Sequence, residues 1–218
     1  AGYGISVSGN NVYTAGTFSN AITFNSVTLS SDSPRPPIQG FIVAYNTSGT
    51  IQWGKTQNSG LGQSWFYGVT SDPSGNVYIA GKFDSNILFE TIPVTTSGLI
   101  DAIFLKYNSS GNVQWVKNGG ASGAHDGAYA IAYSNNMIFA AGNFSSVANF
   151  GIYSVAPNGG GSDIFITNLT ASTGTFGYTI SDGGFTSADY PYSIAVKNQD
   201  MYMAGVTGPS SYGFDTVD

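Results

Sequence analysis

The sequence predicts an all-β protein made of repeated units of about 60 residues. An Ala-Gly pair closes an apolar run at four places, and the glycines are spaced by 65, 61 and 63 residues. A period this regular is typical of repeat architectures. The apolar runs are short, turn-forming residues separate them, and none has a helical period. The four pairs are Ala15-Gly16, Ala80-Gly81, Ala141-Gly142 and Ala204-Gly205.

Aligning the four glycines superposes four predicted β-hairpins, one at the start of each unit. Their linking segments are rich in Gly, Asn, Asp and Ser, which tolerate positive φ or bond their own backbone. Two apolar runs joined by such a segment predict an antiparallel strand pair. The predicted pairs are 3–7 with 12–14, 67–70 with 77–79, 129–132 with 137–139, and 192–195 with 201–203.

A second hairpin follows in three of the four units, and its last strand carries Trp53, Trp115 or Phe176 at the same place. Two hairpins per unit predict a four-stranded antiparallel sheet. A variable segment joins the two hairpins, and we expect binding specificity to lie there. The second strand pairs are 41–45 with 51–53, 103–107 with 113–115, and 164–166 with 175–178, and the variable segments are 28–39, 91–100 and 153–162.

Several predicted strands are apolar on nearly every residue, so both faces of each small sheet must be covered. Sheets stacked face to face about an axis form a β-propeller, and the Ala-Gly pair fits where a strand passes close to a neighbouring backbone. A linear β-solenoid is the alternative, although its repeats are usually shorter. The chain then forms one array of about three and a half blades, with units 1–65, 66–127, 128–190 and an incomplete 191–218.

Two segments of the second unit, Ser74–Gly81 and Asp101–Trp115, resemble the SBBP-type β-propeller repeat of bacteria and archaea. The resemblance extends over the whole chain. The third unit departs from the pattern, because Phe176 replaces the Trp and the turn at 169–174 is longer. The resemblance implies an extracellular or surface-attached propeller, often embedded in a large multidomain protein. It implies no catalytic residues.

In the fourth unit the second hairpin is missing after Gly205. An unclosed array exposes unpaired strand edges, which proteins normally cover or pair. We therefore expect either that the chain is an excerpt of a longer protein or that a neighbouring chain supplies strands. Strand addition between subunits would permit self-assembly through these edges, in a filament or surface layer.

The composition bears on partners and location. Charged residues make up 8% of the chain, and the net charge is −6 without a Lys/Arg cluster, which argues against nucleic-acid binding. There is no cysteine, and no apolar run approaches the roughly 20 residues that span a membrane. The 47 Ser and Thr and 18 Asn make the surface polar without charge. This composition predicts an extracellular or cell-surface location.

No residue is predicted to be catalytic. His125 is the one histidine, and it lies beside Asp126 in a Gly-rich link where a solvated loop is the interpretation. Asp101 and Asp163 occupy equivalent positions before the third strand of their units. A repeated role in bonding backbone amides is therefore favoured over the paired carboxylates of a glycosidase.

Calcium is the one cofactor alternative, and no other cofactor is predicted. The turns Asp72–Asn76 and Asn108–Asn112 contain several oxygen side chains. Neither matches the full calcium-loop pattern with its distal Glu. A hairpin turn explains both segments.

Four Asn-x-Ser/Thr sequons are present, about as many as this composition produces by chance. Asn46 and Asn108 lie in equivalent predicted turns, where a glycan would project into solvent. Asn143 follows Gly142 in a predicted strand and is expected to be less accessible. The fourth candidate glycosylation site is Asn168.

Most of the 14 Tyr, 14 Phe and 3 Trp recur at fixed repeat positions, which indicates packing between units. The exceptions lie at the junctions between units. Trp65 and Phe66 lie at the junction of the first and second units, and Tyr190 lies at the corresponding junction before the fourth. These three aromatic residues are the candidate ligand contacts.

The function predicted from these observations is that of a non-catalytic extracellular β-propeller module, a structural, adhesive or protein-binding scaffold. One alternative is a lectin-like propeller that binds glycans. Another is the non-catalytic part of a larger secreted enzyme. The expected partner is a protein or a glycan at the cell surface.

Overall fold

The computed structural model describes residues 1–31, 38–60, 62–159, 161–184, 188–197, 200–207 and 214–217. These residues form strands and turns and no helix, so the described chain has no helix that could cross a membrane. Every pair of neighbouring strands is antiparallel. The prediction of an all-β antiparallel fold is confirmed.

Three four-stranded sheets and one three-stranded sheet form the body of the fold, here called sheets I to IV. Sheet I contains β1 (Gly2–Ser8), β2 (Asn11–Ser19), β5 (Ile38–Asn46) and β6 (Ile51–Thr56). Sheet II contains β8 (Ser64–Ser71), β9 (Val77–Phe83), β12 (Asp101–Tyr107) and β13 (Val113–Gly119). Sheet III contains β14 (Gly127–Ser134), β15 (Met137–Phe144), β18 (Asp163–Thr170) and β19 (Phe176–Asp182). Sheet IV contains β20 (Tyr190–Lys197), β21 (Asp200–Val206) and β22 (Phe214–Val217).

The predicted hairpins are present in each sheet, with strands slightly longer than the apolar runs. In the fourth unit β22 pairs with β21 as a third strand, with Phe214 opposite Ala204. The described residues contain no fourth strand in this sheet, so they form one hairpin and one further strand. The third strand was not predicted, because 214–217 is too short a run to read as a strand.

Three small hairpins were not predicted. They lie between the second and third strands of sheets I to III, in or beside the segments expected to be variable loops. Two-residue turns join their strands, and each turn begins with a residue at positive φ: Asn25, Glu90 or Gly151. The hairpins are β3 (Ala21–Phe24) with β4 (Val27–Ser30), β10 (Ile87–Phe89) with β11 (Ile92–Val94), and β16 (Ala148–Phe150) with β17 (Tyr153–Val155), and β7 (Ser59–Gly60) pairs with β10.

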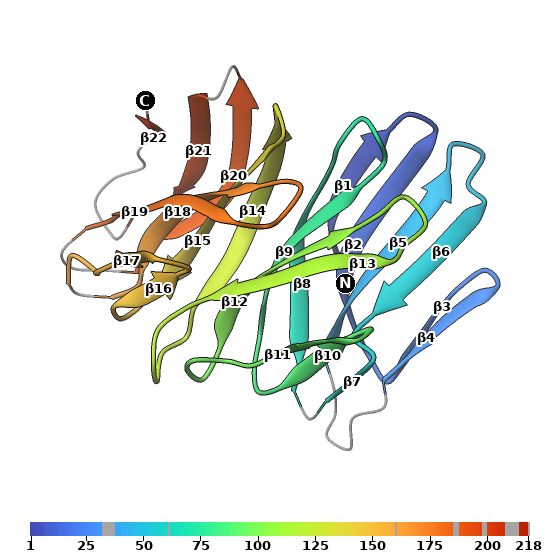
Figure 1. The fold of residues 1–218 in the computed structure, drawn as a ribbon, viewed down its shortest axis with the longest axis horizontal. Helices are drawn as coiled ribbons and strands as arrows, with labels where there is room; N and C mark the ends of the chain where they lie inside the picture. The colour runs from blue at the N-terminus through green and yellow to red at the C-terminus, as the bar shows by residue number, and fades with distance from the viewer. Residues whose placement is uncertain are drawn as a thin grey trace.

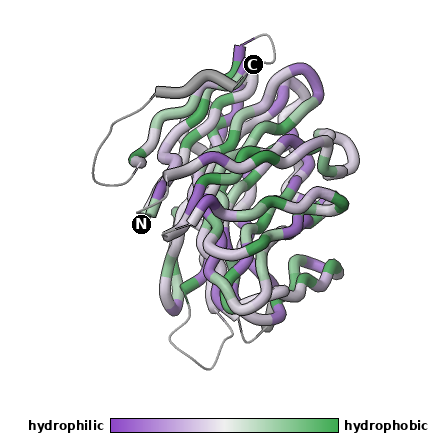
Figure 2. Tube along the Cα trace, turned by 90° about the vertical axis from the view of Figure 1, so that its left-hand side faces the viewer, coloured by the Kyte–Doolittle hydropathy of each residue, from purple (hydrophilic) through white to green (hydrophobic). Residues whose placement is uncertain are grey.

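The sheets follow one another in sequence order, from sheet I in blue to sheet IV in red (Figure 1). Buried apolar residues lie between neighbouring sheets, and hydrophobic stretches run through all the layers of strands (Figure 2). Between sheets I and II, for example, Tyr13 and Ile42 pack with Val69 and Ile79. The prediction that neighbouring units cover the sheet faces is confirmed at these junctions.

The Ala-Gly pair lies where the hairpin backbones approach most closely. A Cβ on Gly81 would come within 2.0 Å of the Trp65 carbonyl oxygen, and one on Gly142 within 2.0 Å of the Gly127 carbonyl oxygen. Neither position can hold a side chain without moving the backbone. Beside these glycines the first strand of each sheet has a β-bulge, and the bulged residue is a tyrosine each time: Tyr3, Tyr67, Tyr129 and Tyr192.

Candidate ligand-binding hollow

The first strands of the four sheets lie next to one another and bring a line of tyrosine rings together. The ring centroids of Tyr3 and Tyr67 are 5.2 Å apart, and those of Tyr67 and Tyr129 are 5.1 Å apart. At sheet IV the bulged residue is Tyr192, but the ring that meets Tyr129 is that of Tyr190, at 6.5 Å. The line therefore ends beside Tyr190.

An open hollow of about 330 Å³ lies at this end of the tyrosine line, between sheets II, III and IV. Three successive sheets contribute to its wall, so its shape depends on how the sheets stack. The hydroxyls, the amide, the carboxyl and the ammonium of the wall suit recognition by hydrogen bonds. Its lining residues are Lys82, Ile100, His125, Asp126, Tyr129, Asn143, Ser145, Ser162 and Tyr190.

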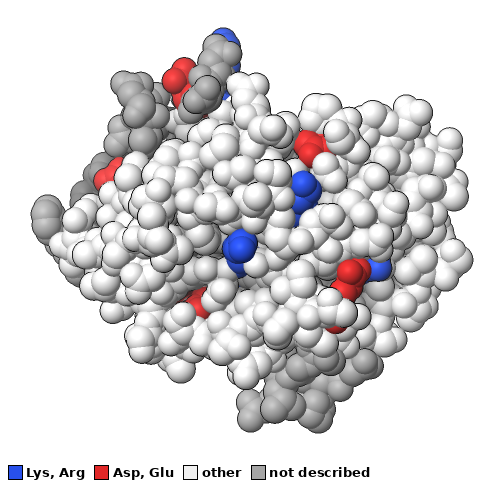
Figure 3. Space-filling model, in the orientation of Figure 1, with Lys and Arg blue, Asp and Glu red and all other residues white. Residues whose placement is uncertain are grey.

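Lys82 is the cationic residue of the wall. Its Nζ lies 5.2 Å from the ring centroid of Trp65 and 5.6 Å from that of Tyr67, which stabilises the ammonium by cation–π attraction. Burial lowers the pKa of Lys82. Within the part of the chain that the structure describes, no carboxylate forms an ion pair with it. The face in Figure 3 shows how widely the charged side chains are spaced on this protein.

Asn143 and Asp126 supply polar groups to the same wall. Asn143 is 5% exposed, and its side-chain amide has no hydrogen bond to any described residue. Asp126 accepts hydrogen bonds from the amides of Ala121 at 2.6 Å and Ser145 at 3.2 Å. Burial is the main cause that raises the pKa of Asp126 to about 6, and the charge of Asp101 adds to it. Because Asn143 lines the hollow, its side-chain amide offers a donor and an acceptor to a ligand there.

The three aromatic candidates have different positions. Tyr190 lines the hollow, and Trp65 lies beneath the ammonium of Lys82 at its edge. Trp65 and Tyr190 also occupy equivalent positions in their sheets. Each lies one residue before the residue that pairs with the repeat glycine, Gly81 or Gly205. Phe66 is fully buried and its ring stacks on Phe89, so in the folded chain it belongs to the core.

Lys82 and Tyr129 were not predicted as site residues, and Asn143 was named only as a sequon and not as a ligand contact. They come from three strands of two sheets, and their proximity depends on how sheets II and III stack. A signal was nevertheless present, since Lys82 and Asn143 each directly follow the repeat glycine. That position holds Thr17 in sheet I and Val206 in sheet IV, and this variation could have marked it as a candidate for specificity.

His125 lines the hollow, whereas Asp101 and Asp163 are fully buried and are not part of its wall. Asp101 accepts a 2.6 Å hydrogen bond from the amide of Ser97, and Asp163 accepts one from the amide of Asn158. Both aspartates therefore bond the backbone of the segment before their own strand. This is the repeated structural role that the sequence predicts.

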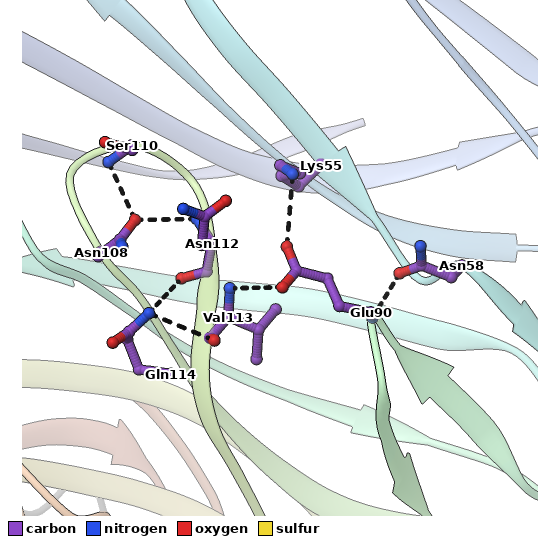
Figure 4. Close-up of polar contacts among 8 residues, drawn as sticks. All are labelled: Lys55, Asn58, Glu90, Asn108, Ser110, Asn112, Val113 and Gln114. Carbon is purple, nitrogen blue, oxygen red and sulfur yellow. Dashed lines mark hydrogen bonds and ion pairs between the residues drawn. The ribbon is translucent and has the colours of Figure 1, made fainter.

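Hydrogen bonds within the chain occupy the two turns considered for calcium. Asp72 Oδ1 accepts from the amides of Ser74 and Asn76, both at 2.9 Å. Asn108 Oδ1 accepts in the same way from the amides of Ser110 at 3.0 Å and Asn112 at 2.9 Å (Figure 4). The described residues contain no group of three or more ionisable metal ligands. The turns are Asx-type hairpin turns, in which the oxygen side chains bond backbone amides.

A second hollow, of about 240 Å³, lies between sheets I and II. Its lining includes Lys55 and Glu90, which form the ion pair drawn in Figure 4. Glu90 Oε1 lies 3.4 Å from Lys55 Nζ, and Glu90 Oε2 accepts a 3.2 Å hydrogen bond from the amide of Val113. The Glu90 amide in turn donates to Asn58 at 2.5 Å. These contacts link the β10–β11 hairpin to sheets I and II, so the ion pair has a structural role at the junction between the two sheets.

The four sequons differ in accessibility. At Asn46 and Asn108 the side-chain Oδ1 accepts the turn hydrogen bonds, which leaves each Nδ2 pointing away from the turn amides. Asn143 is buried, and Asn168 accepts a 3.0 Å bond from the amide of Tyr178 while it is half-buried within β18. Asn46 and Asn108 are therefore the sequons that a glycan fits best.

No protein-family model matches the sequence, and no curated protein matches it. Among solved structures, the chain is similar to the quinohaemoprotein alcohol dehydrogenase ADHIIG from Pseudomonas putida HK5 at 9% identity and a TM-score of 0.38. The match covers 88% of this chain and 34% of that one, so the chain spans about a third of the length of that enzyme. A likeness this weak supports no inference about function. What the coordinates define is an all-β repeat protein with a polar, aromatic-lined hollow.

Proposed function

We propose that this chain is a non-catalytic β-propeller repeat module that acts outside the cell as a structural, adhesive or protein-binding scaffold. The observation that carries the proposal is the same close contact at successive junctions. Gly4 packs on Val69 between sheets I and II, and Gly68 packs on Ile131 between sheets II and III. Because the same contact recurs at equivalent positions, successive sheets pack in the same way, as the units of a rigid repeat array do.

The arrangement of the first strands supports the propeller geometry. Strands β1, β8, β14 and β20 contact one another in sequence order, as the innermost strands of blades do around a common axis. An experimental structure of the chain tests this part of the proposal. Blades arranged about one axis would support it, and a straight stack of sheets would refute it.

An extracellular location is supported by the low charge and by the two accessible sequons at Asn46 and Asn108. Secretion from a eukaryotic host followed by intact-mass analysis tests it. We expect glycans on Asn46 and Asn108 and none on Asn143. A protein that is retained in the cell or misfolds on export would argue against this location.

The scaffold role predicts that the partner contacts exposed hairpins while the core stays unchanged. Ile152, at the tip of β16–β17, is 90% exposed and fits such a contact. A binding screen against extracellular proteins identifies the partner, and Ile152→Asp is expected to weaken it. Ile180→Asp is the matched control, because Ile180 is also exposed but lies in β19, outside the small hairpins and the variable segments. The absence of any protein partner would remove the adhesive form of the proposal.

The hollow favours a second candidate, a lectin-like function. Tyr190 offers a ring for the apolar face of a sugar, while Lys82 and Asn143 offer hydrogen-bond donors. A glycan array tests it, with binding expected to fall at least tenfold in Lys82→Ala and Asn143→Ala. Tyr192→Ala is the control, because Tyr192 is an exposed tyrosine outside the wall of the hollow. An array without hits would exclude this candidate.

A further inference from the structure

The same lysine position recurs at two successive junctions between sheets, with different surroundings. Lys55 on β6 and Lys117 on β13 each lie two residues after the tryptophan of their strand. Each also pairs with the same place on the third strand of its sheet, at Ile42 or Phe104. The two lysines are therefore equivalent in the repeat, and the surroundings of Lys55 indicate what Lys117 can bind.

At the junction of sheets I and II, Lys55 has a carboxylate partner. Glu90 reaches it from the two-residue turn of the β10–β11 hairpin. Glu90 Oε1 lies 3.4 Å from Lys55 Nζ, and Oε2 accepts a 3.2 Å hydrogen bond from the amide of Val113 on the next sheet (Figure 4). An ammonium and a backbone amide thus hold one carboxylate at two points.

The equivalent carboxylate is missing at the junction of sheets II and III. Gly151 begins the turn of the β16–β17 hairpin as Glu90 begins that of β10–β11, and its φ of 62° is close to the 53° of Glu90. A glycine has no side chain that could reach Lys117. In the described part of the chain, no carboxylate forms an ion pair with Lys117. The cation is therefore present without the anion that its equivalent binds.

The second donor of the site has an equivalent as well. Val113 begins β13 opposite Tyr107, and Phe176 begins β19 opposite Leu169, each beside a β-bulge. The register therefore sets the amide of Phe176 at the place of the Val113 amide. Phe176 is level with Val113, two residues before the position that Trp115 takes in its own strand.

An open hollow of about 500 Å³ lies at this junction, compared with about 240 Å³ at the junction that Glu90 bridges. Lys117 is its cationic residue, and no acidic residue is part of its described wall. Much of the remaining wall is apolar, from Val116, Ile152 and Phe176. The hollow therefore combines one unpaired positive charge with apolar side chains, and Ile152 is exposed at its edge.

We infer that this hollow binds an acidic segment of a protein partner, which places a glutamate carboxylate between the ammonium of Lys117 and the amide of Phe176. The inference rests on the proposed protein-binding scaffold and specifies the chemistry of its partner. The charge of Lys117 is complementary to the carboxylate. The apolar wall favours a peptide with an apolar residue beside the carboxylate over an acidic polysaccharide, whose hydroxyls need hydrogen-bonding groups.

A peptide that copies residues 89–92 of this chain tests the site. The probe is acetyl-Phe-Glu-Thr-Ile-amide, and the comparison peptide has Gln in place of Glu. Each is titrated into the isotope-labelled full chain, and binding is followed by the amide resonance of Phe176. We expect the Glu peptide to bind roughly fivefold more tightly than the Gln peptide, which is the scale of one partly exposed ion pair.

Lys117→Gln is expected to remove this preference. Lys55→Gln is the matched control and is expected to keep it, because Glu90 already occupies the site of Lys55. Equal binding of the two peptides, or binding of neither, would overturn the inference. Oligogalacturonate is the third probe, and its binding in place of the peptides would overturn the choice of a protein partner.

A second experiment restores the missing carboxylate within the chain. Gly151→Glu places it where Glu90 stands, and Gly151→Gln is the control with the same length and the same positive φ. In both variants the new Cβ lies 3.1 Å from the Phe176 ring, so this contact cancels in the comparison. The Glu variant is expected to have the higher denaturation midpoint at low salt and to lose the peptide preference, because its own carboxylate occupies the site.

Combining each of these variants with Lys117→Gln completes the comparison. The difference in midpoint between Gly151→Glu and Gly151→Gln is expected to disappear when Lys117 is replaced. If the Glu variant is no more stable than the Gln variant when Lys117 is present, Lys117 is not positioned to hold a carboxylate and the inference is overturned.

These outcomes are distinct from those of the proposed function. A partner that binds the hairpins equally well to the parent chain and to Lys117→Gln would remove the carboxylate site and keep the scaffold. A chain that binds the Glu peptide at Lys117 but finds no extracellular protein partner would keep the site and remove the adhesive role.

Discussion

The indole Nε1 of Trp53 donates a 2.9 Å hydrogen bond to the carbonyl oxygen of Ser109, which lies in the last turn of the next sheet. Trp115 repeats the contact with the carbonyl of Ala171 at 3.2 Å. The two Trp residues at the recurring aromatic position therefore each donate a hydrogen bond that joins one sheet to the next.

Trp115→Phe is expected to lower the free energy of unfolding by about 1–2 kcal/mol, because it removes a buried hydrogen bond and part of a buried ring. Chemical denaturation measures the change. Trp65→Phe is the control, since the Trp65 indole has no hydrogen bond to a described residue. Equal effects of the two substitutions would show that the bond to Ala171 does not stabilise the junction.

Gly111→Ala is expected to cost more than Gly49→Ala. Both glycines have positive φ, which costs an alanine roughly 1–2 kcal/mol. Only at Gly111 does the new methyl also meet the ring of Trp53, at 2.7 Å, and this overpacking adds about 1–3 kcal/mol. Denaturation at protein concentrations where the chain is monomeric gives both values. If Gly49→Ala is as costly as Gly111→Ala, the two sheets do not meet at this turn.

Asp126 is expected to make the protein less stable as the pH rises from about 4 to 6. Its pKa is raised from 3.8 to about 6 in the folded chain, so the folded state holds the proton more tightly than the unfolded state does. The stabilisation is complete below the unfolded pKa and is lost as the pH rises through the folded pKa, with a total of about 3 kcal/mol.

The measurement is the melting temperature against pH for the parent and for Asp126→Asn. The two curves are compared by their slopes, because the amide also loses a hydrogen-bond acceptor. The parent is expected to fall relative to the variant between about pH 4 and 6. Parallel curves would show that the pKa of Asp126 is the same in the folded and the unfolded chain.

Tyr107→Phe is expected to leave the free energy of unfolding unchanged or to raise it. The Tyr107 hydroxyl is buried and has no hydrogen-bond partner among the described residues, so its removal relieves a desolvation cost. Tyr78→Phe is the matched comparison, because the Tyr78 hydroxyl donates a 2.9 Å bond to Asp72. That variant is expected to lose about 1–2 kcal/mol in the same denaturation experiment. A large loss in Tyr107→Phe would reveal a partner for its hydroxyl.

The repeat and its strands could be predicted from the sequence because both depend on local patterns. The glycines at 16, 81, 142 and 205 mark the backbone approach beside each bulge, and the apolar runs mark strands covered on both faces. The small hairpins could not be predicted, since their strands have three or four residues and their turns use Asn25 and Glu90 at positive φ.

The hollow could be predicted only in part. Tyr190 and Trp65 stand out because sheets I and III hold no aromatic residue at their position, but Phe66 beside Trp65 is fully buried in the core. Side chains along a regular strand alternate between the two faces of the sheet, but the bulge at Tyr67 interrupts this alternation. The sequence pattern therefore could not show which face Phe66 is on. Asn143 joins the hollow through the stacking of sheets, which no local pattern encodes.

The packing of each sheet on the next through its first strand is the central claim, and nuclear Overhauser spectroscopy on methyl-labelled protein tests it most directly. Cross-peaks are expected between the α-protons of Gly4 and a methyl of Val69, and between those of Gly68 and a methyl of Ile131. The two residues of each pair belong to different sheets. The absence of both cross-peaks in a folded sample would contradict the stacked-sheet fold.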